Sequence, residues 1–134
     1  MSRFTILKAI HDERERQDAK WGVQDHEIRT PTHTIEEDKD LARRFREMCD
    51  ARAHLGIMTW RDIFLEEVFE VFAEESPARQ RSELVQVAAV AVSMIECIDR
   101  KAQRKPNIFR ALLVSIGGAF YGPESHSKER YKHG

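Results

Sequence analysis

Four glutamates carry the clearest chemical signal in this sequence. Glu66, Glu67 and Glu70 are close together, and Glu83 follows after a short break. On one helix, residues three and four apart share a face, so Glu66, Glu67, Glu70 and Glu74 fall within about 100° of arc. A packed helix with carboxylates beside its apolar flank bears a repulsive cost that a divalent cation would relieve. We therefore expect a metal site here.

Two helices must position these carboxylates. The pattern predicts a third helix over residues 60–75 and an antiparallel fourth over residues 77–104. Glu83 and Gln86 point within about 60° of each other on the fourth helix, because each residue turns the helix by about 100°. They would lie alongside the third-helix glutamates. Oxygen ligands from two helices suit a hard cation such as Mg²⁺, with Mn²⁺ as the alternative ion.

The rest of the chain also predicts helices and no β-strand pair. We expect a first helix over residues 4–20, a loop over 22–33, a second helix over 35–55 and a separate fifth helix over 108–116. The fold class is therefore all-α, a four-helix bundle with an extra C-terminal helical segment. Residues 1–104 form the bundle, and residues 105–134 form a helical appendage and tail of the same domain.

Hydrophobic patterning predicts how the helices bury their faces. The run from 84 to 95 is apolar almost all round, which indicates a helix buried on most sides. Ile6, Leu7 and Ile10 should face inward on the first helix. The second helix has a narrow apolar stripe and charged other faces, so it should lie at the periphery or against a partner subunit; the stripe is Leu41, Phe45, Met48 and Leu55.

The spacing Glu66-Glu67-x-x-Glu70, followed by Glu83-x-x-Gln86, resembles the EExxE…ExxD signature of the MazG-type all-α nucleoside triphosphate pyrophosphohydrolases. The segment 13–26 is similar to the first helix and following loop of MazG-like proteins, and segments 59–62 and 83–90 are similar to a bacterial and phage branch. The resemblance covers roughly residues 7–101. It implies a MazG-like bundle that hydrolyses a (deoxy)nucleoside triphosphate to the monophosphate and pyrophosphate.

The resemblance also implies roles for individual residues. Glu67, Glu70, Glu83 and Gln86 would hold Mg²⁺, and Glu66 or Glu70 would take the proton of the attacking water. Phosphoryl transfer depends mostly on positioning and charge stabilisation, so such a cluster needs no covalent nucleophile.

A nucleobase pocket is implied as well. Trp21 would stack on the base, while Gln24 and His26 would bond its edge. Proteins of this kind assemble as homodimers or homotetramers with pockets completed between subunits, so we expect the same assembly here.

Other interpretations stay open or are disfavoured. Glutamates are good helix formers, and a carboxylate run is often only a solvated face. Gln86 stands where the family signature has Asp, which favours a catalytically weak or inactive protein of the same fold that binds nucleotides or other partners. A lone His11-Asp12 pair does not make an HD phosphohydrolase site. A ferritin-like di-iron site needs Glu-x-x-His, which is absent from the sequence.

Length and composition bear on the number of domains, the binding partners and the location of the protein. The 134 residues suffice for one domain, and 22 basic against 23 acidic residues give no electrostatic reason to expect nucleic-acid binding. Cys49 and Cys97 form no CxxC motif, so we expect reduced, buried thiols. With neither a signal-peptide pattern nor an apolar run long enough for a bilayer, we expect no membrane association and a cytoplasmic location.

Overall fold

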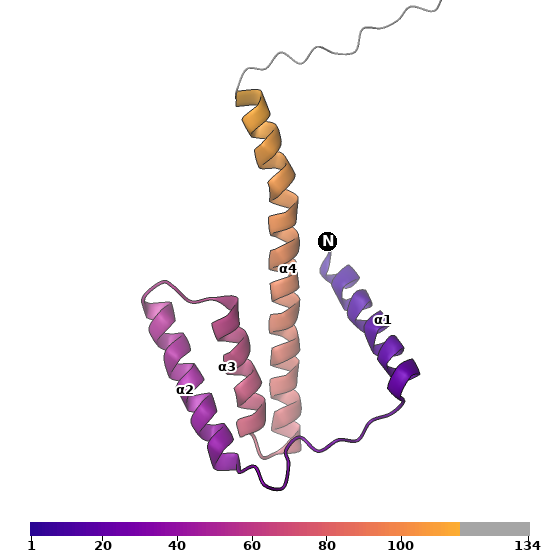
Figure 1. Cartoon of the computed structure of the whole chain (residues 1–134), viewed down its shortest axis with the longest axis vertical. Coiled ribbons are helices and arrows are strands. Elements are labelled where there is room, and N and C mark those ends of the chain that lie inside the picture. Colours follow the sequence, from indigo (N-terminus) through magenta and orange to yellow (C-terminus); the bar gives the residue numbers. More distant parts are fainter. Residues whose placement is uncertain (116–134) are drawn as a thin grey trace, which may run out of the picture. The chain divides into compact units, whose positions relative to one another are not determined.

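The computed structural model describes the backbone of residues 1–115 and the side chains of residues 1–104, and every element in that part of the chain is an α-helix. The helices are α1 (Arg3–Trp21), α2 (Ile35–His54), α3 (Trp60–Ala73) and α4 (Pro77–Ser115) (Figure 1). The predicted all-α class is confirmed for these residues. The chain divides into two units, Met1–Lys101 and Ala102–Gly134, at a boundary inside α4. The single-domain assignment stays a prediction.

The starts of α2 and α3 are fixed by capping boxes. Thr34 accepts a hydrogen bond from the backbone of Glu37, whose carboxylate accepts from the Thr34 backbone at 3.1 Å. Thr59 and Asp62 form the same reciprocal pair at the start of α3, at 2.9 Å for the returning bond. Each box satisfies backbone donors that a helix start leaves unpaired. The predicted starts of these two helices, at residues 35 and 60, are confirmed.

The ends of α1 and α3 also follow local chemistry. Gly22 has a φ of 67° directly after α1, a left-handed conformation that favours glycine. Helix α3 ends at Ala73, two residues before the predicted end, and Glu74 is extended. Gln80 donates to the Glu74 carbonyl at 2.8 Å and so stabilises this turn. The prediction that Glu74 shares the helical face of the other glutamates is therefore wrong.

Helix α4 is longer than predicted. It runs without a break to Ser115, so the predicted end of the fourth helix at residue 104 and the separate fifth helix from residue 108 are wrong for the described residues. Pro106 removes one backbone donor, and a helix accommodates such a loss with a local bend when its neighbours keep their bonds. Residue 116, the last of the predicted fifth helix, and the predicted tail after it lie outside the described residues.

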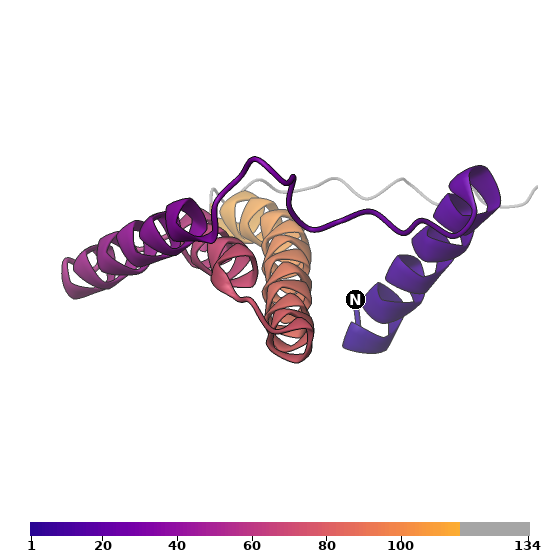
Figure 2. The ribbon, with the colours of Figure 1, turned by 90° about the horizontal axis from the view of Figure 1, so that it is seen from below.

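Helices α2 and α3 pack directly against each other, and α3 lies between α2 and α4 in both Figure 1 and Figure 2. The rings of Phe45 and Phe69 stack at 4.5 Å between centroids. Ala42 and Cys49 are buried, whereas Leu55 of the predicted stripe is 71% exposed because it lies beyond the last turn of α2. The second helix is therefore held by its neighbour in the same chain.

Both cysteines are free, as predicted, but only Cys49 is fully buried. Burial raises the pKa of the Cys49 thiol to about 12, with Glu66 adding to the effect. The thiol is thus neutral at physiological pH and is not a nucleophile. Cys97 is partly buried on α4.

Two buried aspartates tie the α2–α3 pair together. Asp62 is 1% exposed and accepts a hydrogen bond of 2.5 Å from Arg52 of α2. Asp38 accepts from Arg29 and from His33, each at 2.8 Å. Burial alone would raise the pKa of Asp38, but the bonds from Arg29 and His33 outweigh it and hold that pKa below its ordinary value.

The loop before α2 is consequently anchored rather than free. Arg29 also donates to the backbone carbonyl of Phe72 near the end of α3. A single guanidinium thus joins the loop to α2 and α3, and a shallow cavity of about 370 Å³ lies beside it. The sequence predicted the loop but not this anchor.

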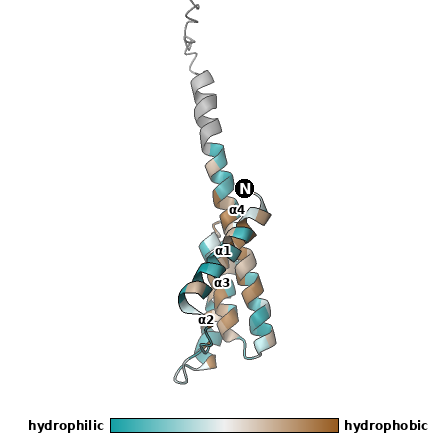
Figure 3. Ribbon diagram, turned by 90° about the vertical axis from the view of Figure 1, so that its right-hand side faces the viewer, coloured by the Kyte–Doolittle hydropathy of each residue, from teal (hydrophilic) through white to brown (hydrophobic). Residues whose placement is uncertain are grey.

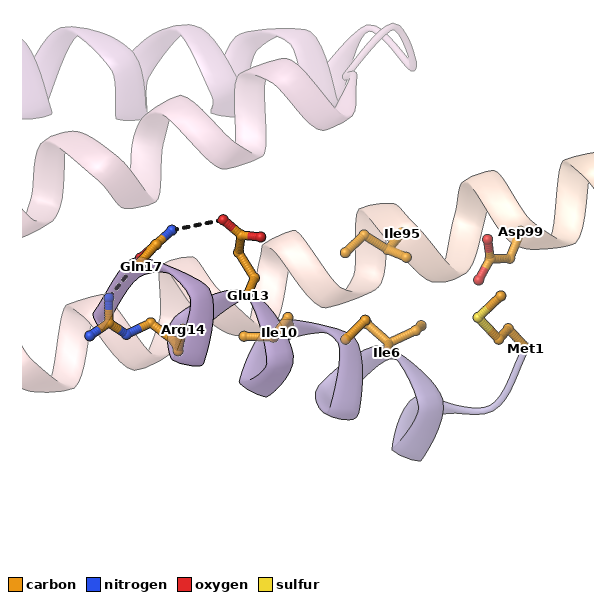
Figure 4. Close-up of a pocket in the computed structure, with 9 residues that line it drawn as sticks. Met1, Ile6, Ile10, Glu13, Arg14, Gln17, Ile95 and Asp99 are labelled. Carbon is orange, nitrogen blue, oxygen red and sulfur yellow. Dashed lines mark hydrogen bonds between the residues drawn. The ribbon is translucent and has the colours of Figure 1, made fainter. Parts of the chain in front are cut away.

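Helices α1 and α4 pair much more loosely. Arg3 donates to Glu96 at 2.9 Å, and Ile6 and Val92 are buried. Cavities of about 430 and 530 Å³ open along the pair. Figure 4 shows Ile6, Ile10 and Ile95 lining the first, with Asp99 and Met1 at one end.

Several apolar side chains of α1 and α4 face solvent. Phe4 is 77% exposed and Ile98 is 65% exposed. Leu7 and Ile10 line the cavities along α4, so they face that helix as expected, but they remain 51% and 40% exposed. The expectation that the fourth helix is buried on most sides is wrong. Figure 3 shows apolar turns along α4, and Leu84 and Val85 of this helix are 47% and 56% exposed. None of the described helices combines the length and apolar character needed to cross a bilayer.

Candidate functional site

The predicted metal-binding carboxylates lie where α3 faces its two neighbours. Glu66, Glu67 and Glu70 are on α3, Glu83 is on the second turn of α4, and all four are half-buried. Helix α3 lies between α2 and α4 (Figure 2). Residues 74–76 join α3 to α4, so Glu83 lies near the start of the helix that follows α3.

The surroundings of Glu67 disfavour its charged form. Burial raises the pKa of Glu67, and the negative charges of Glu66, Glu83 and Glu70 raise it further. The Glu83 effect comes from α4, so the two helices bring these carboxylates close in space. The predicted pairing of Glu67 with Glu83 in one ligand set stays a prediction. Such a cluster favours a bound proton or a bound cation.

Glu70 has a partner that the sequence did not predict. Arg46 of α2 forms a hydrogen-bonded ion pair with Glu70. The bond to Glu70 raises the pKa of Arg46, and the nearby charges of Glu66 and Asp50 contribute. The one sequence feature that could have indicated this contact is that Arg46 directly follows Phe45, a residue of the apolar stripe of the second helix. Its carboxylate partner could not be identified from the sequence, since α2 and α3 are separate elements.

Gln86 lies beside Glu83, as its spacing on one helix predicted. Its side-chain nitrogen donates to the Glu83 carboxylate at 2.9 Å. Gln86 is exposed, whereas Glu83 is half-buried. The amide therefore neutralises no charge but occupies one carboxylate oxygen of Glu83.

The side-chain oxygens of the predicted ligands are of the kind that binds a hard cation, but they do not point toward one common position. Within residues 1–104, no group of three or more His, Cys, Asp or Glu side chains is arranged to hold a metal ion. Glu70 is directed to Arg46, and Glu83 accepts from Gln86. All four predicted ligands offer oxygen, the atom that Mg²⁺ prefers. Side-chain rotation would be needed to bring these oxygens around one ion.

Trp21 is the last residue of α1, and its side chain is 55% exposed. The ammonium of Lys20 lies 4.8 Å from the centre of the indole ring. A cavity of about 240 Å³ adjoins the ring, lined by Glu13, Arg16, Gln17, Lys20 and Trp21. An exposed indole beside a cation is suited to stack on a planar ring that carries phosphate.

Gln24 and His26 lie in the loop after α1. The Nε2 atoms of the two side chains are 3.4 Å apart, so these two predicted base-binding residues are neighbours. Among residues 1–104, no hydrogen bond or ion pair joins Trp21, Gln24 or His26 to the glutamate cluster. The structure thus assembles two separate groups, the carboxylates with Arg46 and the polar pair of the loop.

No protein-family model matches this chain, and neither a curated protein nor a solved structure matches it. The described geometry and the residues themselves are therefore the basis for any functional conclusion.

Proposed function

We propose that this protein is a Mg²⁺-dependent pyrophosphohydrolase that converts a (deoxy)nucleoside triphosphate to the monophosphate and pyrophosphate. The observation that supports the proposal is the raised pKa of Glu67, whose causes are burial and the negative charges of carboxylates on both α3 and α4. The EExxE…ExxQ spacing of these residues resembles the MazG-type signature. The corresponding fold would be a MazG-like four-helix bundle with additional C-terminal residues.

The residues suit a simple hydrolysis. A water oxygen forms a bond to the α-phosphorus, the bond from that phosphorus to the bridging oxygen breaks, and pyrophosphate leaves with the electron pair. Glu66 or Glu70 accepts the proton of the water. Glu67, Glu70, Glu83 and Gln86 would hold Mg²⁺, which supplies charge neutralisation at the phosphates when bound.

The base would be recognised at the end of α1. The indole of Trp21 is 55% exposed and would stack on the base, and Gln24 and His26 of the following loop offer donors and acceptors to a base edge. The resemblance to the MazG-type proteins implies that a second subunit completes the pocket. The exposed apolar side chains of α1 and α4 support a homodimer or homotetramer.

Pyrophosphate release is the decisive measurement. The purified protein is incubated with each common NTP and dNTP, with Mg²⁺, with Mn²⁺ and with a chelator, and pyrophosphate and orthophosphate are measured separately. We expect metal-dependent pyrophosphate release with at least one nucleotide and no orthophosphate. Absence of release with every nucleotide and both metals would overturn the enzymatic proposal.

A second function, nucleotide binding with weak or no catalysis, is favoured by Gln86. The amide donates to Glu83 and brings no charge to the cluster. Calorimetry with a non-hydrolysable triphosphate separates the two functions, because a binder retains affinity without turnover. Gln86→Asp should then strengthen Mg²⁺ binding, since it adds a carboxylate beside Glu83.

A further inference from the structure

We propose that the apolar groove between α1 and α4 is the contact face for a second copy of this chain. The two grooves pack antiparallel, so that Arg14 of the partner subunit meets Asp99, an acid at one end of the groove. The contact deepens the homo-oligomer of the proposed function by naming its face and its polar pair. It rests on that assembly alone and needs neither catalysis nor a metal ion.

The groove consists of two cavities of about 430 and 530 Å³, and Ile10 of α1 lines both. Ala88 and Ala89 of α4 line the second cavity, and such small side chains let another helix approach closely. Leu7 and Val85 border the same cavity and are 51% and 56% exposed. The groove is therefore open and apolar, with room for several side chains of a neighbouring helix.

The two helices do not bury this surface between themselves. Among residues 1–104, Ile6 is the only fully buried residue of α1, and Val92 is the only one of α4. Helices in proteins gain most of their stability by packing an apolar face, so this pair needs a further layer. The formal net charge of the chain is -1, so two copies would not repel each other strongly.

The charges at the two ends of the first cavity favour a second copy as the occupant. Asp99 lies at one end, and within residues 1–104 its Oδ2 atom is buried without a hydrogen-bond partner. Arg14 lies toward the other end, with Ile10 and Ile95 between them (Figure 4). A two-fold axis exchanges the ends, so each Arg14 meets the Asp99 of the other copy. The dimer would thus supply the missing partner of a buried carboxylate twice.

Arg14 can be redirected to this contact at little cost. Its guanidinium donates to Gln17 and Asp18 of its own helix, and the side chains of the Arg14–Asp18 pair are each more than half exposed. Exposed ion pairs contribute little to stability, whereas a charged donor to a buried carboxylate forms a strong hydrogen bond. Glu13, at the same end of the groove, is bonded to Arg16, which offsets its negative charge.

The first test reverses each charge in the full chain and measures association by light scattering over a dilution series. Asp99→Arg and Arg14→Asp should each weaken the dimer by at least about a hundredfold, because both contacts become repulsive. An equal mixture of the two variants should recover association to within about tenfold of wild type, since both contacts of the mixed dimer join opposite charges. Arg43→Asp is the matched control, because the Arg43 and Arg14 side chains are both 56% exposed but Arg43 lies on α2.

A crosslink tests the packing independently of the charges. The two-fold axis would pass near Ile10, between the two ends of the first cavity. A short bis-maleimide should therefore join the Ile10→Cys variant into a covalent dimer. Ile57→Cys, at a 59% exposed position after α2, should stay monomeric in the same treatment. Wild type is treated in parallel, because Cys97 is only partly buried.

The outcomes are separable from those of the enzymatic test. A wild type that stays monomeric overturns the inference, as does association that the charge reversals leave unchanged or that the mixture does not recover. Pyrophosphate release by a monomer would reject the contact alone, and a dimer without release would reject the proposed function alone. Circular dichroism checks that each variant is folded. If a charge reversal unfolds the chain, the Ile10→Cys crosslink decides, and its absence overturns the inference.

Discussion

The α2–α3 pair and the α1–α4 pair differ in how their side chains are partnered. In α2–α3, polar groups are matched within the chain: Asp62 with Arg52, and Asp38 with Arg29 and His33. In α1–α4, apolar side chains face solvent beside a few polar contacts. There, within residues 1–104, the Oδ2 atom of Asp99 is buried without a hydrogen-bond partner.

This difference indicates which part of the chain is complete by itself. Buried charges are tolerated in α2–α3 because each has a partner and hydrogen bonds. The apolar surface of α1–α4 gains its stabilisation only when something covers it. The glutamate cluster lies where the two pairs meet, on α3 and the start of α4. Its geometry would then be influenced by whatever covers α4.

The largest expected effect is at this junction. Glu67→Gln should lower turnover by at least about a hundredfold, because even indirect supports of a metal ligand contribute up to that much. The melting temperature should hold or rise slightly, since a repelling charge is removed. Turnover and thermal melting are measured together. Glu75→Gln is the control, an exposed acid just beyond α3 that should change neither.

The next effect concerns self-association. Leu7→Glu should weaken the expected oligomer by roughly tenfold to a hundredfold, because it places a charge where an apolar side chain would be buried. Light scattering over a dilution series measures the association. Leu55→Glu, at an exposed position after α2, is the matched control. Equal effects of the two substitutions would remove the distinction between the helix pairs.

A smaller effect is expected at the end of α1. Trp21→Ala should weaken nucleotide binding by about tenfold, the cost of losing a stacking partner. The fold should be kept because the indole is exposed. The Michaelis constant and the melting temperature are the two readouts. A fall in melting temperature with an unchanged Michaelis constant would make Trp21 a packing residue.

The smallest expected effect is on the pH dependence of stability, through the paired carboxylate of Asp38. The pKa of Asp38 is lowered in the folded state, so its contribution is present above the unfolded pKa and is lost as pH falls through the folded one. Asp38→Asn should cost about 1–3 kcal/mol of unfolding free energy at pH 7.

Urea unfolding at pH 7 and near pH 3 checks this expectation. The difference between wild type and Asp38→Asn should shrink at the lower pH, where the wild-type carboxylate begins to protonate. Asp18→Asn, in an exposed pair with Arg14, should match wild type at both values. A constant difference across pH would mean that the charge of Asp38 does not stabilise the fold.

The sequence by itself determined the features that depend on near neighbours. The helix starts at Thr34 and Thr59 follow from capping residues three positions apart, and Gly22 ends α1 because it accepts a positive φ. The side-by-side placement of Glu83 and Gln86 follows from helical spacing. Each of these depends on residues within one helical turn, so no knowledge of the fold was needed.

Only the tertiary structure decided which distant groups meet. Arg46 pairs with Glu70, and Arg29 reaches both Asp38 and the Phe72 carbonyl, because α2 packs against α3. Periodicity predicted burial for Leu7 from its own helix, but exposure depends on what the rest of the chain leaves uncovered. A charged or apolar side chain has many possible partners of its kind in a sequence. Packing selects one of them, or none, by distance.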